Sequence, residues 1–214
     1  MKISASLLAA DFSRLKEEII RFQDQIDHLH IDAMDGWFVP NIAFGPSSVF
    51  WVRKATNLPL EVHLYLQQPE KFLLEYLRAG ANVILPHFEA VQDISSLARM
   101  TREYDAAFGL AINPTTPLTK LLPILDSLDS ILILTVNPGF EGQKILPNSA
   151  KRITRAKDLR EELGLSFEIL VDGGINEDTV KTVISAGADT IIMGSAIFKN
   201  PNANLLLQSL RKEF

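Results

Sequence analysis

The sequence predicts a (β/α)₈ barrel formed by one domain over residues 1–214. The chain has 214 residues, 47% of them hydrophobic, and no linker or low-complexity segment divides it, which suits a single large domain. Eight short apolar segments follow one another, and amphipathic stretches separate most of them. Because this alternation does not show whether the sheet closes, a doubly wound open sheet is the alternative.

The eight apolar segments are the predicted strands, since they are short and bounded by polar or turn-forming residues. They are Lys2–Ser6, Asp27–Asp32, Leu60–Tyr65, Asn82–Pro86, Ala107–Ile112, Ser130–Val136, Glu168–Asp172 and Asp189–Gly194.

The helices are predicted from amphipathic stretches between these strands: "FSRLKEEIIRFQDQ", "PEKFLLEYLRAG", "SSLARMTREY" and "NEDTVKTVISAG". In "RAGAN" and "SAGAD", Gly80 and Gly187 stand where a helix ends before the next strand.

Composition excludes several classes of function. The net charge of −5 argues against nucleic acid or an anionic membrane as the main partner. The longest apolar runs, such as Ile131–Leu134, are too short to span a bilayer, and Asp11 and Arg14 come too early for a signal peptide. The absence of cysteine excludes disulfides and thiol catalysis. We therefore expect a cytoplasmic protein.

Polar side chains at the ends of three predicted strands indicate a metal site. Active sites of these barrels lie at the carboxyl ends of the strands. There we find His30, Asp32, His63 and Asp172, each on the face that we take to point inward. Two histidines with two carboxylates suit zinc, iron(II), manganese or cobalt, although a pair such as His30 and Asp32 alone is more often structural.

We do not expect His28 or His87 to be a metal ligand. His28 lies one inward step deeper than His30, so we expect it in the barrel interior or its bottom layer. His87 follows Pro86 at the end of the fourth strand, where it could touch a ligand. We favour a loop histidine whose hydrogen bonds are satisfied within the protein.

Glycine-containing loops after the last three strands indicate a phosphate site. They are "NPGFEGQ" at 137–143, "DGGIN" at 172–176 and "GSAIF" at 194–198. Glycine lets backbone N–H groups approach an anion, and barrels often bind phosphate with the loops after strands seven and eight. A single glycine of this kind would indicate only a tight turn, but three successive loops favour a phosphate.

Motifs along nearly the whole chain resemble the ribulose-phosphate 3-epimerase family. They are "SLLAADF", "LHIDAMDGWFVPN", "EVHLYLQQPEKFL", "HFEA", "AINPTTPL", "LTVNPGFEGQ", "VDGGINEDTV" and "GADTIIMGSAIF", in family order. The resemblance implies a (β/α)₈ barrel, one divalent metal ion, and interconversion of D-ribulose 5-phosphate and D-xylulose 5-phosphate. It also implies a homo-oligomer whose partner is a small ketose phosphate.

The resemblance also implies roles for individual residues. His30, Asp32, His63 and Asp172 match the metal ligands, and Asp32 and Asp172 match the two acid/base residues. The remaining matches contact the substrate or its phosphate: Ser6, His63, Gly139, Phe140, Glu141, Gly142, Gly173, Gly174, Gly194 and Ser195.

Four positions depart from the family pattern. Trp37 stands where histidine is common, Tyr65 and Leu134 replace methionines, and Glu141 replaces a glycine, whereas Met34 is kept. The usual methionines line the pocket, so we expect these changes to reshape the pocket mouth rather than join the chemistry. A carboxylate beside a phosphate loop is unfavourable unless it turns outward. The departures bear on the choice of sugar more than on the type of reaction.

The expected reaction explains the motif "HIDAMDG". Epimerisation next to a carbonyl removes a proton and returns one to the opposite face, so one carboxylate is needed on each face. We expect Asp32 and Asp172 on opposite sides of the ring, with coupled titration, because one must accept a proton while the other donates.

The sequence leaves three other functions to compare with this one. The same reaction on a 6-phosphate such as D-allulose 6-phosphate is the nearest alternative. A phosphate-binding lyase or decarboxylase is disfavoured because the second strand has no lysine. A non-catalytic sugar-phosphate sensor would not need two acids at these positions.

Overall fold

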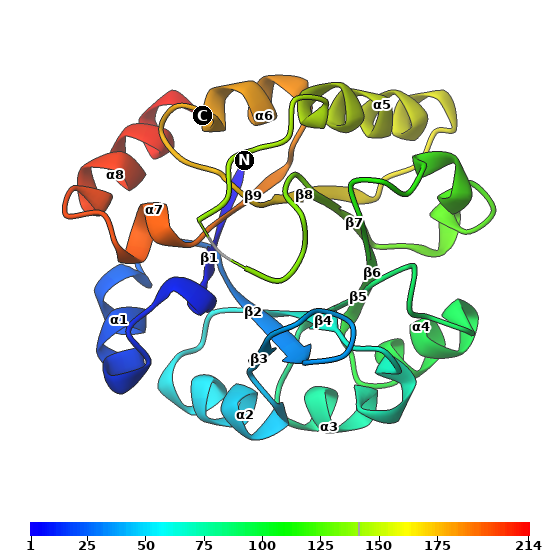
Figure 1. Cartoon of the computed structure of the whole chain (residues 1–214), viewed down its shortest axis with the longest axis horizontal. Helices are drawn as coiled ribbons and strands as arrows, with labels where there is room; N and C mark the ends of the chain where they lie inside the picture. Colours follow the sequence, from blue (N-terminus) through cyan, green and yellow to red (C-terminus); the bar gives the residue numbers. More distant parts are fainter. Residues whose placement is uncertain (141) are drawn as a thin grey trace.

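The computed structural model describes residues 1–140 and 142–214 and shows a closed parallel barrel with helices outside it (Figure 1). Strand β1 pairs with β2 on one side and with β9 on the other, which closes the ring and excludes the open sheet. The barrel strands are β1 Lys2–Ser6, β2 His28–Asp35, β4 Leu60–Tyr65, β5 Val83–Pro86, β6 Ala107–Ile112, β7 Ser130–Leu134, β8 Glu168–Asp172 and β9 Thr190–Met193. The predicted fold class is confirmed.

Helices pack around the barrel and bury their apolar faces against the outward side chains of the strands (Figure 1). They are α1 Leu15–Phe22, α2 Pro46–Ala55, α3 Leu73–Arg78, α4 Ile94–Arg102, α5 Ser149–Glu162, α6 Val180–Ala186, α7 Ser195–Phe198 and α8 Ala203–Glu213. Gly80 and Gly187 follow α3 and α6 with φ of 105° and 116°, as their positions in "RAGAN" and "SAGAD" predict.

Two connections depart from a regular alternation. Between β6 and β7 the chain forms two short 3₁₀ turns, η4 Leu118–Leu121 and η5 Leu125–Ser127. Prolines 114, 117 and 123 remove backbone donors there, which disfavours a continuous helix. Strand β2 runs three residues beyond its predicted end and pairs antiparallel with the short strand β3 Ile42–Ala43.

The barrel interior has two different walls. The wall formed by β5 to β9 is mainly apolar and includes Leu85, Ala111, Leu132, Leu134, Leu170 and Ile192, with the buried polar residues Ser130 and Thr190 at the starts of β7 and β9. The wall formed by β1, β2 and β4 carries buried polar groups, namely Ser4, Ser6, His30, Asp32, Glu61 and His63. The site described below lies at the top of this polar wall.

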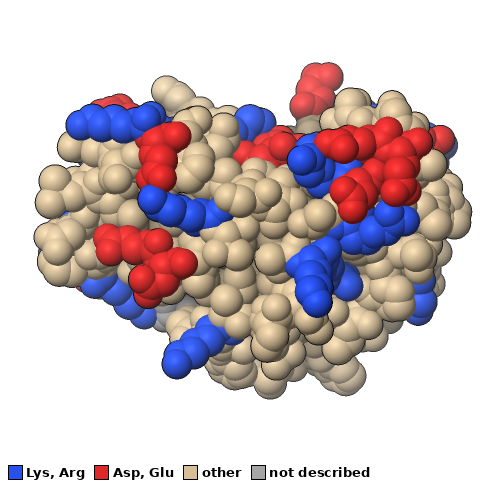
Figure 2. Space-filling model, turned by 90° about the horizontal axis from the view of Figure 1, so that it is seen from above, with Lys and Arg blue, Asp and Glu red and all other residues tan. Residues whose placement is uncertain are grey.

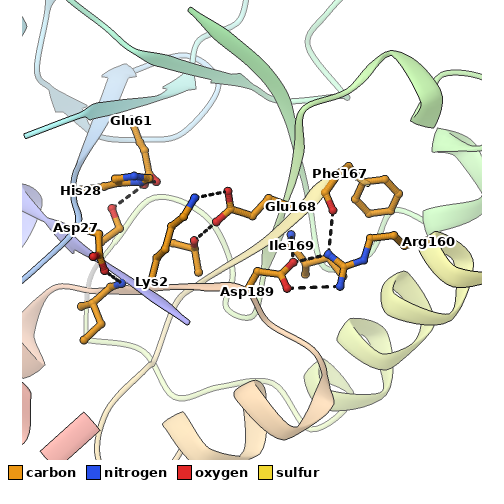
Figure 3. Close-up of polar contacts among 12 residues, drawn as sticks. Lys2, Asp27, His28, Glu61, Arg160, Phe167, Glu168, Ile169 and Asp189 are labelled. Atoms are coloured by element: carbon orange, nitrogen blue, oxygen red, sulfur yellow. Dashed lines mark hydrogen bonds and ion pairs between the residues drawn. The ribbon is translucent and has the colours of Figure 1, made fainter. Parts of the chain in front are cut away.

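A repeated polar clamp closes the opposite end of the barrel. The residue just before β9, Asp189, donates its backbone N–H to the carbonyl of Ile169 at 2.9 Å. Its carboxylate accepts the N–H of Ile169 at 2.8 Å and the guanidinium of Arg160 from α5 (Figure 3). Arg160 also donates to the carbonyl of Phe167. One side chain thus joins two strands and the helix that precedes them.

The same arrangement occurs four times in the described parts of the chain. Each copy joins an oxygen-bearing side chain before one strand, the backbone of the preceding strand, and an arginine of the helix that lies before that strand around the ring. The other three copies are Asp27 with Ile3 and Arg211, Asn82 with Leu60 and Arg53, and Asp129 with Phe108 and Arg102. The barrel floor therefore repeats every two strands.

Neither sign of charge dominates the one face of the molecule that Figure 2 shows. On the face seen in Figure 2, acidic and basic side chains are interspersed, in agreement with the small net charge of −5. None of the helices within 1–140 and 142–214 has the length and apolar character needed to cross a membrane.

We predict that Asp189→Ala destabilises the protein more than Asp189→Asn. Alanine leaves the N–H of Ile169 and the guanidinium of Arg160 without their acceptor, at roughly 1–3 kcal/mol, whereas an amide keeps one acceptor, as Asn82 does in its own clamp. Urea unfolding measures both. The control is Glu162→Ala, which removes only an exposed ion pair with Arg155 and should change stability by less than about 1 kcal/mol. Equal losses for the two Asp189 variants would contradict this role for the clamp.

Candidate active site

Strand register brings the predicted ligands together. Asp32 of β2 lies opposite His63 of β4, and His30 lies opposite Ser6 of β1. Because alternate residues of a strand face the same way, these side chains point into the barrel near its carboxyl end. Asp172 reaches the same point from the end of β8. One ligand atom from each of His30, Asp32, His63 and Asp172 lies within 4.8 Å of the others.

The distances within this cluster fit one metal ion. His30 Nε2 lies 3.2 Å from His63 Nδ1, and Asp32 Oδ1 lies 3.4 Å from the first and 3.5 Å from the second. Two ligand atoms bound at about 2.0–2.1 Å to a tetrahedral ion are separated by about 3.3 Å. The three atoms therefore have the spacing of one coordination sphere, and the cluster could hold a metal ion.

A buried carboxylate below the cluster orients His30. Glu61 is 1% exposed and accepts a hydrogen bond from Ser4 Oγ at 2.6 Å. Its carboxylate also contacts Nδ1 of His28 (Figure 3). It lies 3.3 Å from Nδ1 of His30 as well. Donation from His30 Nδ1 to Glu61 leaves Nε2 facing the cluster, an arrangement common where a carboxylate orients a metal-binding histidine. His28 lies below the ligands at the start of β2, which agrees with its predicted deeper position.

The two oxygens of Asp32 have different partners. Oδ1 faces the two histidines, whereas Oδ2 accepts a hydrogen bond from Ser6 Oγ at 2.8 Å. Ser6 also lines the cavity above. The serine therefore holds the carboxylate in one orientation and leaves Asp32 Oδ2 on the side of the cavity.

The pKa values of the two acids move apart. Burial alone would raise the pKa of Asp32, but His30 and His63 hold it well below its usual range. Burial, followed by the negative charge of Asp32, raises the pKa of Asp172 to about 7. Opposite shifts of this kind are typical of two acids that hold one proton between them.

The pKa values of His30 and His63 also move in opposite directions. Burial alone would lower the pKa of His30, but Asp32 and Glu61 raise it well above its usual value. Burial lowers the pKa of His63 to about 3. In the metal-free protein His30 therefore carries a proton that a metal ion must displace, whereas His63 is neutral.

A cavity of about 160 Å³ opens above the cluster. Ser6, Asp32, Met34, Tyr65 and Asp172 line its lower part. The three predicted glycine loops meet at its rim and contribute Gly139, Phe140, Gly142, Gly173, Gly174, Gly194 and Ser195. Of the predicted substrate contacts, Glu141 lies outside the described residues.

One of these glycines is required by the backbone. Gly174 has a φ of 67°, and a Cβ there would lie 2.8 Å from the backbone nitrogen of Ile145 and 2.9 Å from the carbonyl of Gln143. A side chain at this position would push apart the loops after β7 and β8. Their close approach forms the rim where the sequence predicts a phosphate.

The departures from the family pattern fall at different depths. Trp37 is 84% exposed and is absent from the described cavity lining, so the expectation that it shapes the pocket is wrong for this residue. Tyr65 is 3% exposed, lines the cavity and packs on the His63 ring, with ring centroids 3.9 Å apart. Leu134 belongs to the apolar interior wall.

The expected placement of the two acids needs one correction. In the strand order, β8 and β2 are separated on their shorter side by β9 and β1. The two strands are therefore not on opposite sides of the ring. Asp32 and Asp172 still approach one point, because each lies near the carboxyl end of its strand and turns inward.

His87 and Glu89 lie closer to the candidate site than the sequence predicts. His87 is fully buried and contacts His63, and its other nitrogen lies 3.3 Å from Glu89. The sequence carried a signal, because "HFE" places a carboxylate two residues after a strand-end histidine. Such a carboxylate commonly orients an imidazole.

Known proteins resemble the chain in sequence over nearly its whole length. The model of the ribulose-phosphate 3 epimerase family matches residues 2–198. The ribulose-phosphate 3-epimerase of Bacillus subtilis is 37% identical over 99% of this chain and 98% of its own. The enzyme of the same name from Synechocystis is 41% identical over 94% of this chain and 88% of its own.

Solved structures at lower identity share the fold. The structure of KGPDC from Streptococcus mutans has a TM-score of 0.76 and 12% identity, and the match covers 99% of this chain and 96% of the other. This similarity supports the barrel architecture alone.

We predict that the protein binds one divalent ion and that its affinity weakens as the pH falls below 7. Asp172, with its pKa raised to about 7, and His30, with its pKa raised well above its usual value, are protonated at low pH and must lose those protons to bind metal. Each displaced proton weakens binding about tenfold per pH unit below the pKa. Competition with a chromophoric chelator between pH 6 and 8, after metal removal, measures the effect. An affinity independent of pH, or no binding, would contradict the assignment.

Proposed function

Because the chain belongs to the ribulose-phosphate 3-epimerase family, we propose that it interconverts D-ribulose 5-phosphate and D-xylulose 5-phosphate by proton transfer through two carboxylates. Asp32 and Asp172 are the proposed acid/base pair. His30, His63 and the same two acids are the proposed ligands of one divalent ion.

One observation carries the proposal. Four potential ligand atoms lie within 4.8 Å of one another at the base of a cavity whose rim is formed by glycine loops. A small molecule bound in this cavity would lie next to two carboxylates, and the separate rim would be available for its phosphate. A sensor that only bound the sugar would not require this pair of acids.

The two acids have complementary properties. At neutral pH Asp32 is ionised, and Ser6 donates to the oxygen on the cavity side. The raised pKa of Asp172 lets it hold or release a proton near pH 7. One residue removes the proton from C3 and the other returns a proton to the opposite face, and the roles exchange with the direction of reaction.

The histidines hold the ion without adding negative charge. The bound ion would stabilise the negative charge that develops on the substrate oxygens as the C3 proton leaves. The ligand set favours zinc, iron(II), manganese or cobalt, because imidazole disfavours magnesium and calcium.

The rim residues have a separate proposed role. Backbone N–H groups of Gly173, Gly174, Gly194 and Ser195 are proposed to hold the phosphate, with Gly139, Phe140, Glu141 and Gly142 forming the adjoining loop. Ser6 and His63 are the proposed contacts to the sugar.

The proposal includes a cytoplasmic homo-oligomer. The family resemblance supports the oligomer, and the cysteine-free composition supports a reducing compartment. Sedimentation equilibrium measures the first, and fractionation of the source cells measures the second.

A six-carbon substrate such as D-allulose 6-phosphate is the second candidate. The observation behind it is Tyr65, which lines the cavity where the family pattern has methionine. We predict that Tyr65→Met changes the ratio of kcat/KM for ribulose 5-phosphate and allulose 6-phosphate about tenfold, because a pocket contact is worth roughly 1–3 kcal/mol. Metal content should stay the same. Trp37→His, at an exposed position, is the control and should leave the ratio unchanged. An unchanged ratio for Tyr65→Met would exclude a role in specificity.

We predict that Asp172→Asn loses epimerisation by about 10²–10⁴-fold while its stability changes little, because asparagine keeps the size and removes the acid/base function. In heavy water Asp32 should still exchange the C3 hydrogen of one epimer without inverting it. The other epimer should exchange only in Asp32→Asn. NMR follows both exchanges, and metal content is measured alongside.

Two outcomes would contradict the acid/base assignment. Near wild-type interconversion by either variant with its metal intact would exclude a two-base mechanism. Exchange of the same epimer by both variants would mean that the acids are assigned to the wrong faces.

A further inference from the structure

The His63 ring makes a contact on the side that faces away from the proposed metal. Its Nε2 lies 3.0 Å from Nε2 of His87, and both rings are fully buried. At this distance one nitrogen must donate and the other must accept, because two lone pairs or two protons would repel each other. The direction of this hydrogen bond decides which nitrogen of His63 has a free lone pair.

The contact between His87 and Glu89 fixes the direction of the hydrogen bond between His63 and His87. Nδ1 of His87 lies 3.3 Å from Oε2 of Glu89, and an ionised carboxylate can only accept. His87 therefore carries its proton on Nδ1 and presents a lone pair at Nε2. His63 must then donate from Nε2, which leaves its Nδ1 unprotonated. That atom is the one that lies 3.2 Å from His30 Nε2 and 3.5 Å from Asp32 Oδ1.

Glu89 is itself held in place. Its Oε1 accepts the backbone N–H of Asn113 at 2.9 Å and the hydroxyl of Thr116. Both carboxylate oxygens thus have donors facing them, and these contacts hold the pKa of Glu89 at about 2 even though burial alone would raise it. Each oxygen is matched to a donor, so an amide at this position would direct its NH₂ group toward one of these donors.

Aromatic rings restrict the motion of His87. Phe38 packs against it with ring centroids 4.5 Å apart, and Tyr65 packs at 4.7 Å. The imidazole is therefore held in the orientation that joins His63 to Glu89, and it does not line the cavity above the cluster within the described residues. His87 touches neither the cavity nor the ion site directly.

We propose that His87 and Glu89 are positioning residues that fix His63 as its Nε2–H tautomer and so present Nδ1 to the metal ion. This inference rests on the metal site of the proposed function. Residues that orient metal-binding histidines in this way typically change metal affinity by 10–100-fold when they are replaced.

The first experiment compares zinc binding by wild type and Glu89→Gln, using competition with a chromophoric chelator. We expect Glu89→Gln to bind zinc about 10–100-fold more weakly. Glu70→Gln is the matched control, because Glu70 also accepts a backbone N–H, from Gln92 at 2.8 Å, and contacts no histidine in the described parts of the chain. Its affinity should equal that of wild type. Equal affinities for all three proteins would overturn the proposal.

A pair of substitutions at His87 separates hydrogen bonding from packing. Glutamine can offer its side-chain oxygen to Nε2–H of His63, whereas leucine fills the space without an acceptor. We expect His87→Gln to keep most of the zinc affinity and His87→Leu to lose about as much as Glu89→Gln. Comparable losses for both His87 variants would mean that the ring acts through packing, against the proposal. Urea unfolding identifies any variant whose loss reflects unfolding.

The tautomers can be observed directly. Long-range ¹H–¹⁵N spectra of protein labelled at histidine should show Nε2–H for His63 and Nδ1–H for His87, both without metal and with zinc. A proton on Nδ1 of His63 in the metal-free protein, or zinc bound through Nε2, would overturn the proposal. A wild type that binds no zinc would contradict the metal site of the proposed function, and the metal-free spectrum would still decide the direction of the hydrogen-bond chain.

Discussion

A polar group inside a packed barrel must find its partner within the protein, because removing one partner of a buried charged pair costs roughly 3–5 kcal/mol. Glu61 meets this constraint by accepting from Ser4 and by contacting both His28 and His30. The same contacts turn Nε2 of His30 toward the cavity, where it meets Asp32 and His63. The hydrogen bonds that satisfy Glu61 therefore also set the position of His30 above it. The candidate site is the upper end of a series of buried polar contacts that begins near the barrel floor.

The division of the interior into a polar and an apolar wall separates two tasks. Strands β1, β2 and β4 supply fixed polar groups, while Leu132, Leu170 and Ile192 fill the other side of the barrel. The apolar side chains that face these polar groups lower the local dielectric, which strengthens the interactions among the polar groups. Burial of this kind contributes to the separation of the pKa values of Asp32 and Asp172. The loops above, which are proposed to hold a small anion, contribute Gly139, Gly142, Gly173, Gly174 and Gly194 to the cavity rim.

The sequence predicted the strands closely because a parallel barrel buries both faces of each strand, which makes the apolar segments short and distinct. It missed the end of β2, because "AMD" continues the strand into a hairpin that depends on pairing with Ile42 and Ala43. The grouping of His30, Asp32, His63 and Asp172 could be expected from alternation and from their positions at strand ends. The role of His87 could be expected only in part. "HFE" places Glu89 near it, but Glu89 is held by Asn113 and Thr116, which lie in a loop after a different strand. These contacts arise only when β5 and β6 pair side by side.

The clamps of the barrel floor also bear on how the chain can be connected. The clamp of Asp27 takes its arginine from α8, whereas the other three take theirs from helices directly before the strands they join. In space the four are equivalent, so the point where the chain starts and stops is not marked by a different set of contacts. A circular permutant in which the present ends are linked and the chain is opened in the loop between β5 and α4 would keep every arginine, acceptor and strand pair of the floor. The contacts of the barrel floor therefore do not depend on which loop is opened.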